Sequence, residues 1–259
     1  MSEIKPIAIL INDEKAKQAS EFLAEQLSLP IIGTEQSSSF SFLLFFDQGM
    51  LKLIQSNMDK MGAVWVDFGK GKSAYRQKHQ GKGKLPVSRA CGIKQNHRPS
   101  IIDGTAGLGQ DAFVLAGLGC QLLCIEQQPV IAALLADGLL RAKESGNLQL
   151  QEIVAKMQLV EGESETILKD NRADVVYLDP MYPHQENRKQ AKVKKGMQLF
   201  RSLSGTLSNE PELLAAALTA ATDRVVVKRP DWASPIAGKE PTYQVPAKNH
   251  RFDIYKTSL

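Results

Sequence analysis

Long apolar runs and cysteines are scarce in this sequence of 259 residues. No apolar run approaches the roughly 18 residues that a membrane-spanning helix needs, so we expect no membrane span. The first residues lack a charged region followed by a long apolar stretch, and we expect no signal peptide. The three cysteines, Cys91, Cys120 and Cys124, show no metal-binding or disulfide spacing, which favours buried thiols in a cytoplasmic protein.

Acidic residues are missing from one long segment. From Gly69 to Ile102 there are nine lysines and arginines and no aspartate or glutamate, and from His184 to Arg201 there are six against the single Glu186. The remainder holds 17 of the 32 basic and 27 of the 28 acidic residues. Two basic segments on an otherwise acidic chain indicate a polyanion partner, although a solvated loop can have the same composition. The candidate contacts are Lys70, Lys72, Arg76, Lys78, Lys192, Lys194 and Lys195.

Hydrophobic periodicity divides the chain into three parts. Residues 1–68 predict a small α/β domain, with a helix over 14–27 and strands over 7–11, 40–46, 51–54 and 63–66. Residues 69–98, basic and glycine-rich, predict a connecting segment that is either a linker or a substrate-binding segment, and its charge favours RNA binding.

The third part, residues 99–259, alternates strands with helices. The predicted strands are 100–102, 121–125, 157–160, 174–178, 224–227, 243–245 and 252–255, and the predicted helices are 110–118, 130–143 and 210–221. Such alternation predicts a mostly parallel sheet with helices on both faces.

A glycine-rich turn connects the first strand of this part to its first helix. Residues 101–111 read Ile-Ile-Asp-Gly-Thr-Ala-Gly-Leu-Gly-Gln-Asp. The spacing of Gly104, Gly107 and Gly109 differs from the G-x-G-x-x-G of dinucleotide-binding proteins, and with Asp103 ahead of it is similar to motif I of class I methyltransferases. Glu126 ends the next strand, where a carboxylate can accept hydrogen bonds from both hydroxyls of an adenosine ribose. Both features predict a cofactor site at the carboxyl ends of these strands.

A second motif follows the strand over 174–178. Residues 175–183 read Val-Val-Tyr-Leu-Asp-Pro-Met-Tyr-Pro, similar to the [Asp/Asn]-Pro-Pro-[Tyr/Phe] motif of enzymes that methylate exocyclic amines, with Met181 in place of the second proline. The carboxylate of Asp179 and the carbonyl of Pro180 can each accept one N–H of a base amine. Proline keeps the turn rigid, and the ring of Tyr182 can stack on an extruded base. These three residues are the predicted catalytic group, and the chemistry needs no metal.

Five stretches together resemble the RsmJ family, which methylates N2 of one guanosine in bacterial 16S ribosomal RNA. They are residues 103–116, 129–139, 175–184, 224–231 and 250–255. The resemblance implies a class I, Rossmann-like methyltransferase fold with a seven-stranded sheet, S-adenosylmethionine as cofactor, and 16S rRNA or the small ribosomal subunit as partner. It also implies cofactor contacts at Gln110, Asp111, Glu126, Gln127, Glu163, Ser164 and Asp179. The family often has arginine where Gln110 and Gln127 stand.

Three other functions remain open from the residues alone. The same chemistry suits adenine N6 in DNA or RNA. An NAD-dependent oxidoreductase would share a ribose-binding acid such as Glu126, but the glycine spacing and the Asp179-Pro180 corner disfavour it. A non-catalytic RNA-binding protein could also use a methyltransferase fold, and would bind RNA without turnover.

Overall fold

The computed structural model describes residues 6–56, 62–70, 85–181, 203 and 209–257. Two compact units are present, the first built on Met1–Val66 and the second on Asp67–Pro180 with Ser208–Leu259. The second unit therefore includes the described parts of the predicted connecting segment. Tyr182 and all the candidate RNA-binding residues except Lys70 lie outside the described residues.

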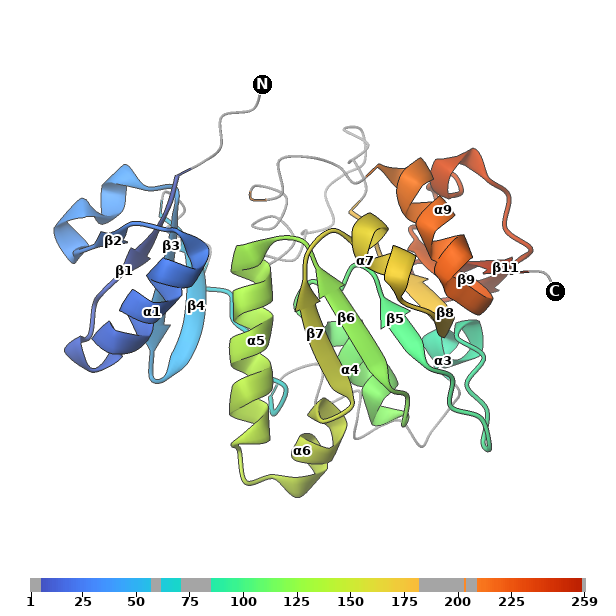
Figure 1. Ribbon diagram of the computed structural model, residues 1–259, viewed down its shortest axis with the longest axis horizontal. Coiled ribbons are helices and arrows are strands. Elements are labelled where there is room, and N and C mark those ends of the chain that lie inside the picture. Colours follow the sequence, from blue (N-terminus) through green and yellow to red (C-terminus); the bar gives the residue numbers. More distant parts are fainter. Residues whose placement is uncertain (1–5, 57–61, 71–84, 182–202, 204–208, 258–259) are drawn as a thin grey trace. The chain divides into compact units, whose positions relative to one another are not determined.

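The first unit is a four-stranded sheet in the order β2-β1-β3-β4 (Figure 1). Its elements are β1 (Ile7–Leu10), η1 (Glu14–Ala16), α1 (Lys17–Leu27), β2 (Ile31–Ile32), η2 (Thr34–Ser39), β3 (Phe42–Asp47) and β4 (Met50–Gln55). β1 runs parallel to β2 and β3, and β3 and β4 form an antiparallel hairpin. Gln48 and Gly49 both have positive φ at its turn, which is the geometry that two-residue hairpin turns require.

The predicted strand over 63–66 is wrong. Val64 forms only an isolated antiparallel bridge with Leu53 of β4. Val64 and Val66 are buried while Trp65 is 43% exposed. The alternation that suggested a strand therefore reflects burial of every second side chain, and no continuous ladder of hydrogen bonds accompanies it.

The second unit is a seven-stranded sheet in the order β10-β11-β9-β8-β5-β6-β7. The strands are β5 (Ile101–Asp103), β6 (Leu122–Glu126), β7 (Met157–Glu161), β8 (Ala173–Leu178), β9 (Ala221–Arg229), β10 (Tyr243–Pro246) and β11 (Arg251–Lys256). β11 runs antiparallel to its neighbours β9 and β10, and the other pairs are parallel. This arrangement confirms the predicted class I methyltransferase fold with a mostly parallel sheet.

Helices cover both faces of this sheet (Figure 1). They are α3 (Pro86–Ala90), α4 (Gln110–Gly117), α5 (Pro129–Lys143), α6 (Leu148–Val154), α7 (Ser164–Asp170), α9 (Glu210–Ala220) and the 3-10 helix η4 (Ile236–Gly238). The sequence did not predict α3, α6, α7 or η4. Each has seven residues or fewer, too short to show two full turns of apolar periodicity. None of the helices in the described ranges is both long and apolar enough to cross a bilayer.

The central strand β8 shows how the sheet divides its two faces. Val176 and Leu178 pack in one apolar cluster with residues of α7 and α9, whereas the hydroxyl of Tyr177 reaches Asp111 on α4. Successive side chains of a strand point to opposite faces, so the apolar run of β8 fills both layers of the core. The three cysteines are buried and unpaired, as predicted, and burial raises the pKa of Cys120 to about 11.

Candidate active site

β5 lies between β6 and β8, where the strand order reverses direction. The carboxyl ends of parallel strands meet at one edge of the sheet, and a doubly wound sheet binds its ligands at such a reversal. The glycine turn after β5, Glu126 at the end of β6 and Asp179 after β8 therefore come to the same edge. The structure brings together groups that are separated by up to 75 positions in the sequence.

Glycine is required at the three positions of the turn for different structural reasons. A Cβ on Gly104 would stand 2.8 Å from Cδ2 of Leu178, and a Cβ on Gly109 would stand 2.7 Å from Cδ1 of Leu135. Packing therefore excludes side chains at both. At Gly107 (φ +54°), no atom of the described residues lies within 4 Å of a Cβ position. Gly107 serves the left-handed backbone and leaves open space beside the turn.

Glu126 holds the glycine turn directly. Its Oε2 accepts a hydrogen bond from the backbone N–H of Gly107 at 2.8 Å, and its Oε1 accepts one from Gln128 at 2.8 Å. The side chain is buried, which raises the pKa of the carboxyl group, while the neighbouring backbone N–H groups act to lower it. Each carboxylate oxygen has a second lone pair, so Glu126 can still accept hydrogen bonds from a ligand.

Asp103 and Ser164 also support the turn. Asp103 is buried at the end of β5 and accepts a hydrogen bond from the N–H of Thr105 at 3.1 Å. Burial, the largest influence, raises the pKa of Asp103 to about 8. The hydroxyl of Ser164 donates to the carbonyl of Gly104. Both predicted cofactor residues thus make contacts that shape the glycine turn.

Three other predicted cofactor residues are exposed at the rim of this edge. Gln110 is the first residue of α4, Gln127 follows β6, and Glu163 precedes α7. No hydrogen bond within the described part of the chain engages their side chains. The structure positions them at the ends of β5, β6 and β7, the same edge as Glu126.

The Asp-Pro corner is joined to the glycine turn by a hydrogen bond. β5 and β8 are adjacent and parallel, and the N–H of Asp179 donates to Oγ1 of Thr105 at 2.6 Å. Pro180 is buried next to it. The side chain of Asp179 is 38% exposed, yet the surrounding protein excludes enough water to raise the pKa of its carboxyl group. The corner thus presents an oxygen-rich surface beside the turn that follows β5.

Lys228 is a site residue that the sequence reasoning missed. Its Nζ lies 2.7 Å from Oδ2 of Asp179 and 2.6 Å from Oδ2 of Asp111, and Tyr177 also donates to Asp111 at 2.8 Å. A signal was present, because Lys228 ends the otherwise buried run Val225–Val227. A charged side chain at the carboxyl end of a buried parallel strand points to a functional edge.

His250 lies close to this charged group. Its ring meets Phe252 edge-on, with the ring centroids 5.0 Å apart. Burial and the nearby ammonium of Lys228 lower the pKa of His250, although Asp111, Asp179 and Asp231 act in the opposite direction. Burial, the largest influence, therefore favours the neutral imidazole.

The comparisons with known proteins agree with this geometry. A family model described as "Putative SAM-dependent methyltransferase" matches residues 23–257. The crystal structure of a SAM-dependent methyltransferase from Neisseria gonorrhoeae superposes with a TM-score of 0.72 at 30% identity, over 97% of this chain and 96% of that one. The chain is therefore an S-adenosylmethionine-dependent methyltransferase, and the expectations of an enzyme and of this cofactor are confirmed.

Two relatives define the family more closely. A protein of Thioalkalivibrio sulfidiphilus named "Ribosomal RNA small subunit methyltransferase J" is 45% identical over 97% of this chain and 98% of its own length. One of the same name from Shewanella amazonensis is 47% identical over 83% of this chain and 86% of its own. The chain belongs to the ribosomal RNA small subunit methyltransferase J family, which confirms the resemblance found in its motifs.

The residues at this edge fit S-adenosylmethionine. Open space adjoins Gly107, and the buried carboxylate of Glu126 retains lone pairs for ribose hydroxyls. The N-terminus of α4 adds backbone N–H groups and a partial positive charge, suited to the carboxylate of the methionine part.

Proposed function

We propose that this enzyme transfers a methyl group from S-adenosylmethionine to the exocyclic N2 of a guanosine in 16S rRNA. The names of its relatives support the substrate. The hydrogen bond from the N–H of Asp179 to Thr105 supports the proposed methyl transfer, because it fixes the Asp-Pro corner against the cofactor turn. Methylation of ribosomal RNA by this enzyme is consistent with the cytoplasmic location expected from the sequence.

The amine of guanine is a weak nucleophile because its lone pair is delocalised into the ring. Asp179 and the carbonyl of Pro180 each accept one of its N–H groups, which pulls the nitrogen toward tetrahedral geometry and localises its lone pair toward the methyl group. When bound, S-adenosylmethionine supplies a methyl group on a sulfonium, which already has a good leaving group. Orientation of the amine by this corner can supply roughly 7–11 kcal/mol of the acceleration. Tyr182 follows the corner in sequence and supplies a ring on which the base stacks.

The cofactor contacts follow from the strand ends. Glu126 accepts hydrogen bonds from the ribose hydroxyls, and Gln127 and Glu163 flank the adenosine from the ends of β6 and β7. Gln110 lies beside the methionine part at the start of α4. The glycine turn keeps the shape that cofactor binding requires through Asp103, Gly104, Gly107 and Ser164. Asp111 does not need to touch the cofactor, because it acts on the site through its ion pair with Lys228.

RNA binding is assigned to the two basic segments. We propose three parts for the chain, a small N-terminal domain (1–68), a basic connecting segment (69–98) and the methyltransferase domain (99–259). The contacts to the RNA backbone are Lys70, Lys72, Arg76, Lys78, Lys192, Lys194 and Lys195.

Replacing Lys192, Lys194 and Lys195 with glutamine tests this assignment. The slope of log affinity against log salt should become shallower by about 0.7–0.9 for each phosphate that the protein no longer neutralises. Titrations at several salt concentrations measure the slope, and an unchanged slope would move the RNA surface elsewhere.

Methyl transfer from labelled S-adenosylmethionine onto undermethylated 16S rRNA and onto small subunits tests the proposal. Digestion to nucleosides should give N2-methylguanosine. N6-methyladenosine would instead establish the adenine alternative. Stable RNA binding without transfer to either substrate would favour the non-catalytic alternative, and the comparison of RNA with subunits identifies which form is modified.

A further inference from the structure

The charged group at the end of β9 joins three elements of the methyltransferase unit. Lys228 from β9 bridges Asp111 on α4 and Asp179 after β8, with N–O distances of 2.6 and 2.7 Å. Tyr177 of β8 also donates to Asp111. Lys228 contacts the Oδ2 atom of each carboxylate, and no other described residue donates to the carboxylate of Asp179. Among the described residues, no donor therefore engages its Oδ1.

The charges in this group depend on one another. Burial, the largest influence, and the nearby carboxylate of Asp111 both raise the pKa of Asp179. Lys228 acts in the opposite direction and lowers the pKa of Asp179. Burial alone would lower the pKa of Lys228, but the two carboxylates outweigh it and raise the pKa well above its ordinary value. The ammonium is thus charged throughout the physiological range.

Other titratable groups face this cluster from neighbouring elements. Asp103 at the end of β5 acts to raise the pKa of Tyr177. Burial raises the pKa of Asp103 itself to about 8, Asp111 and Asp179 act in the same direction, and Lys228 acts to lower it. His250, just before β11, acts to lower the pKa of Asp179. Among these described groups, Lys228 is the one that forms an ion pair with Asp179.

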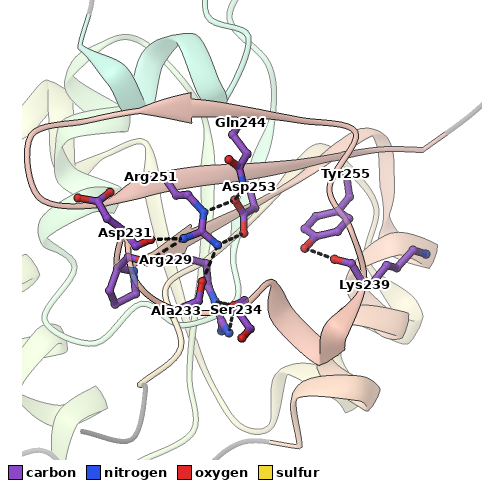
Figure 2. Close-up of polar contacts among 10 residues, drawn as sticks. Arg229, Asp231, Ala233, Ser234, Lys239, Gln244, Arg251, Asp253 and Tyr255 are labelled. Carbon is purple, nitrogen blue, oxygen red and sulfur yellow. Dashed lines mark hydrogen bonds and ion pairs between the residues drawn. The ribbon is translucent and has the colours of Figure 1, made fainter. Parts of the chain in front are cut away.

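A buried polar network fixes the end of β9 next to Lys228 (Figure 2). Arg251 binds both oxygens of the fully buried Asp253 and donates to the carbonyls of Pro230, Asp231 and Ala233. Arg229 donates to the carbonyl of Ser234 and forms an ion pair with Glu210 of α9. The backbone on the carboxyl side of Lys228 is therefore held by two arginines. Across the ladder Lys228 pairs with Phe252 of β11, so its backbone is restrained on that side as well.

We propose that Lys228 is a positioning residue that holds Asp179 in its ionised form and in the orientation that accepts the base amine. The inference rests on the proposed function, because it assigns Asp179 the amine. Lys228 occupies Oδ2, and Oδ1 accepts an N–H of the base. As the methyl–nitrogen bond forms and the methyl–sulfur bond breaks, the base nitrogen gains positive charge, which an ionised carboxylate stabilises and a protonated one does not. The methylated nitrogen then loses one proton to solvent.

The experiment is a pH profile of single-turnover methyl transfer for the wild type, Lys228→Met and Lys228→Arg. Removal of an adjacent cation raises the pKa of a carboxyl group by roughly 1–3 units. Activity needs the carboxylate and falls as pH decreases, so the acid limb of Lys228→Met should move upward by that amount. Below the new limb the rate should fall about tenfold per pH unit. Lys228→Arg keeps the charge and should restore most of the wild-type profile.

Two further variants complete the design. Lys256→Met removes another ion-paired lysine of the same sheet, paired with Asp223 at the far end of β9, and should keep the wild-type limb. Asp111→Asn removes the like charge beside Asp179 and should move the limb to lower pH, opposite to Lys228→Met. This variant tests the electrostatics even if Lys228→Met fails to fold. Calorimetric affinity for S-adenosylhomocysteine separates a loss of cofactor binding from a shift in titration.

An acid limb of Lys228→Met that coincides with the wild type would overturn the proposal, as would a limb of Asp111→Asn that moves upward. A loss of rate at every pH with the acid limb unmoved would also overturn it, because Lys228 would then have no effect on the ionisation of Asp179. The proposed function fails separately, if the wild type itself forms no N2-methylguanosine.

Discussion

Replacement of Glu126 by glutamine tests the link between the β6 carboxylate and the cofactor turn. The two oxygens of Glu126 accept N–H groups of Gly107 and Gln128 at 2.8 Å each. Glutamine has one oxygen and one NH₂ group, so one of these N–H groups would face a donor. A hydrogen bond to a charged group is worth about 1.5–3 kcal/mol, and we expect the protein without ligand to be less stable by at least one such amount.

The same change should weaken cofactor binding. A ribose hydroxyl without its charged acceptor, together with a less ordered glycine turn, should reduce the affinity for S-adenosylhomocysteine by about tenfold to a hundredfold. For a unit of this size, 1.5–3 kcal/mol corresponds to a fall in Tm of roughly 3–12 °C.

Two measurements follow from these magnitudes. Calorimetric titration gives the affinity, and thermal unfolding gives Tm for the transition that S-adenosylhomocysteine raises in the wild type. Glu152→Gln, on the exposed surface of α6, is the matched control and should change neither value. An affinity within twofold of the wild type would refute the assignment of Glu126, and a lower Tm with unchanged affinity would leave it a purely structural residue.

Three further predictions concern the turn, the corner and the network. Asp179→Asn should lower the single-turnover rate by about 10²–10³-fold, as removal of one preorganised polar group does elsewhere, with S-adenosylhomocysteine affinity nearly unchanged; a rate within tenfold of the wild type would contradict its role. Gly109→Ala should destabilise the unit by roughly 2–5 kcal/mol, because positive φ and overlap with Leu135 add together. Gly107→Ala should cost only the roughly 1–2 kcal/mol of positive φ but weaken S-adenosylhomocysteine binding, and denaturation with titration distinguishes the pair. Asp253→Asn removes the negative charge that the buried Asp253 presents to Arg251 and should lower the unfolding free energy by about 3–5 kcal/mol in chemical denaturation, whereas a change under about 1 kcal/mol would show that the carbonyls and a neutral acceptor satisfy Arg251.

The sequence by itself determined where most strands of the second unit lie along the chain and the motifs at their ends. Alternating strands and helices predict a parallel sheet, and its strand ends meet at one edge. The glycine turn, Glu126 and Asp179 could therefore be assigned to one site from the sequence. Short helices were missed because their periodicity is brief, and the pattern over 63–66 was misread because burial alone produced the alternation of Val64 and Val66.

The tertiary structure alone decided which polar groups touch. Lys228 meets Asp179 from 49 positions away and Asp111 from 117, and no local pattern encodes such pairing. It also showed Ser164 bound to the carbonyl of Gly104 and Asp253 bound to Arg251. Periodicity specifies which face of an element is apolar, whereas a hydrogen bond requires a donor and an acceptor within about 3 Å, which only the packed arrangement of several elements fixes.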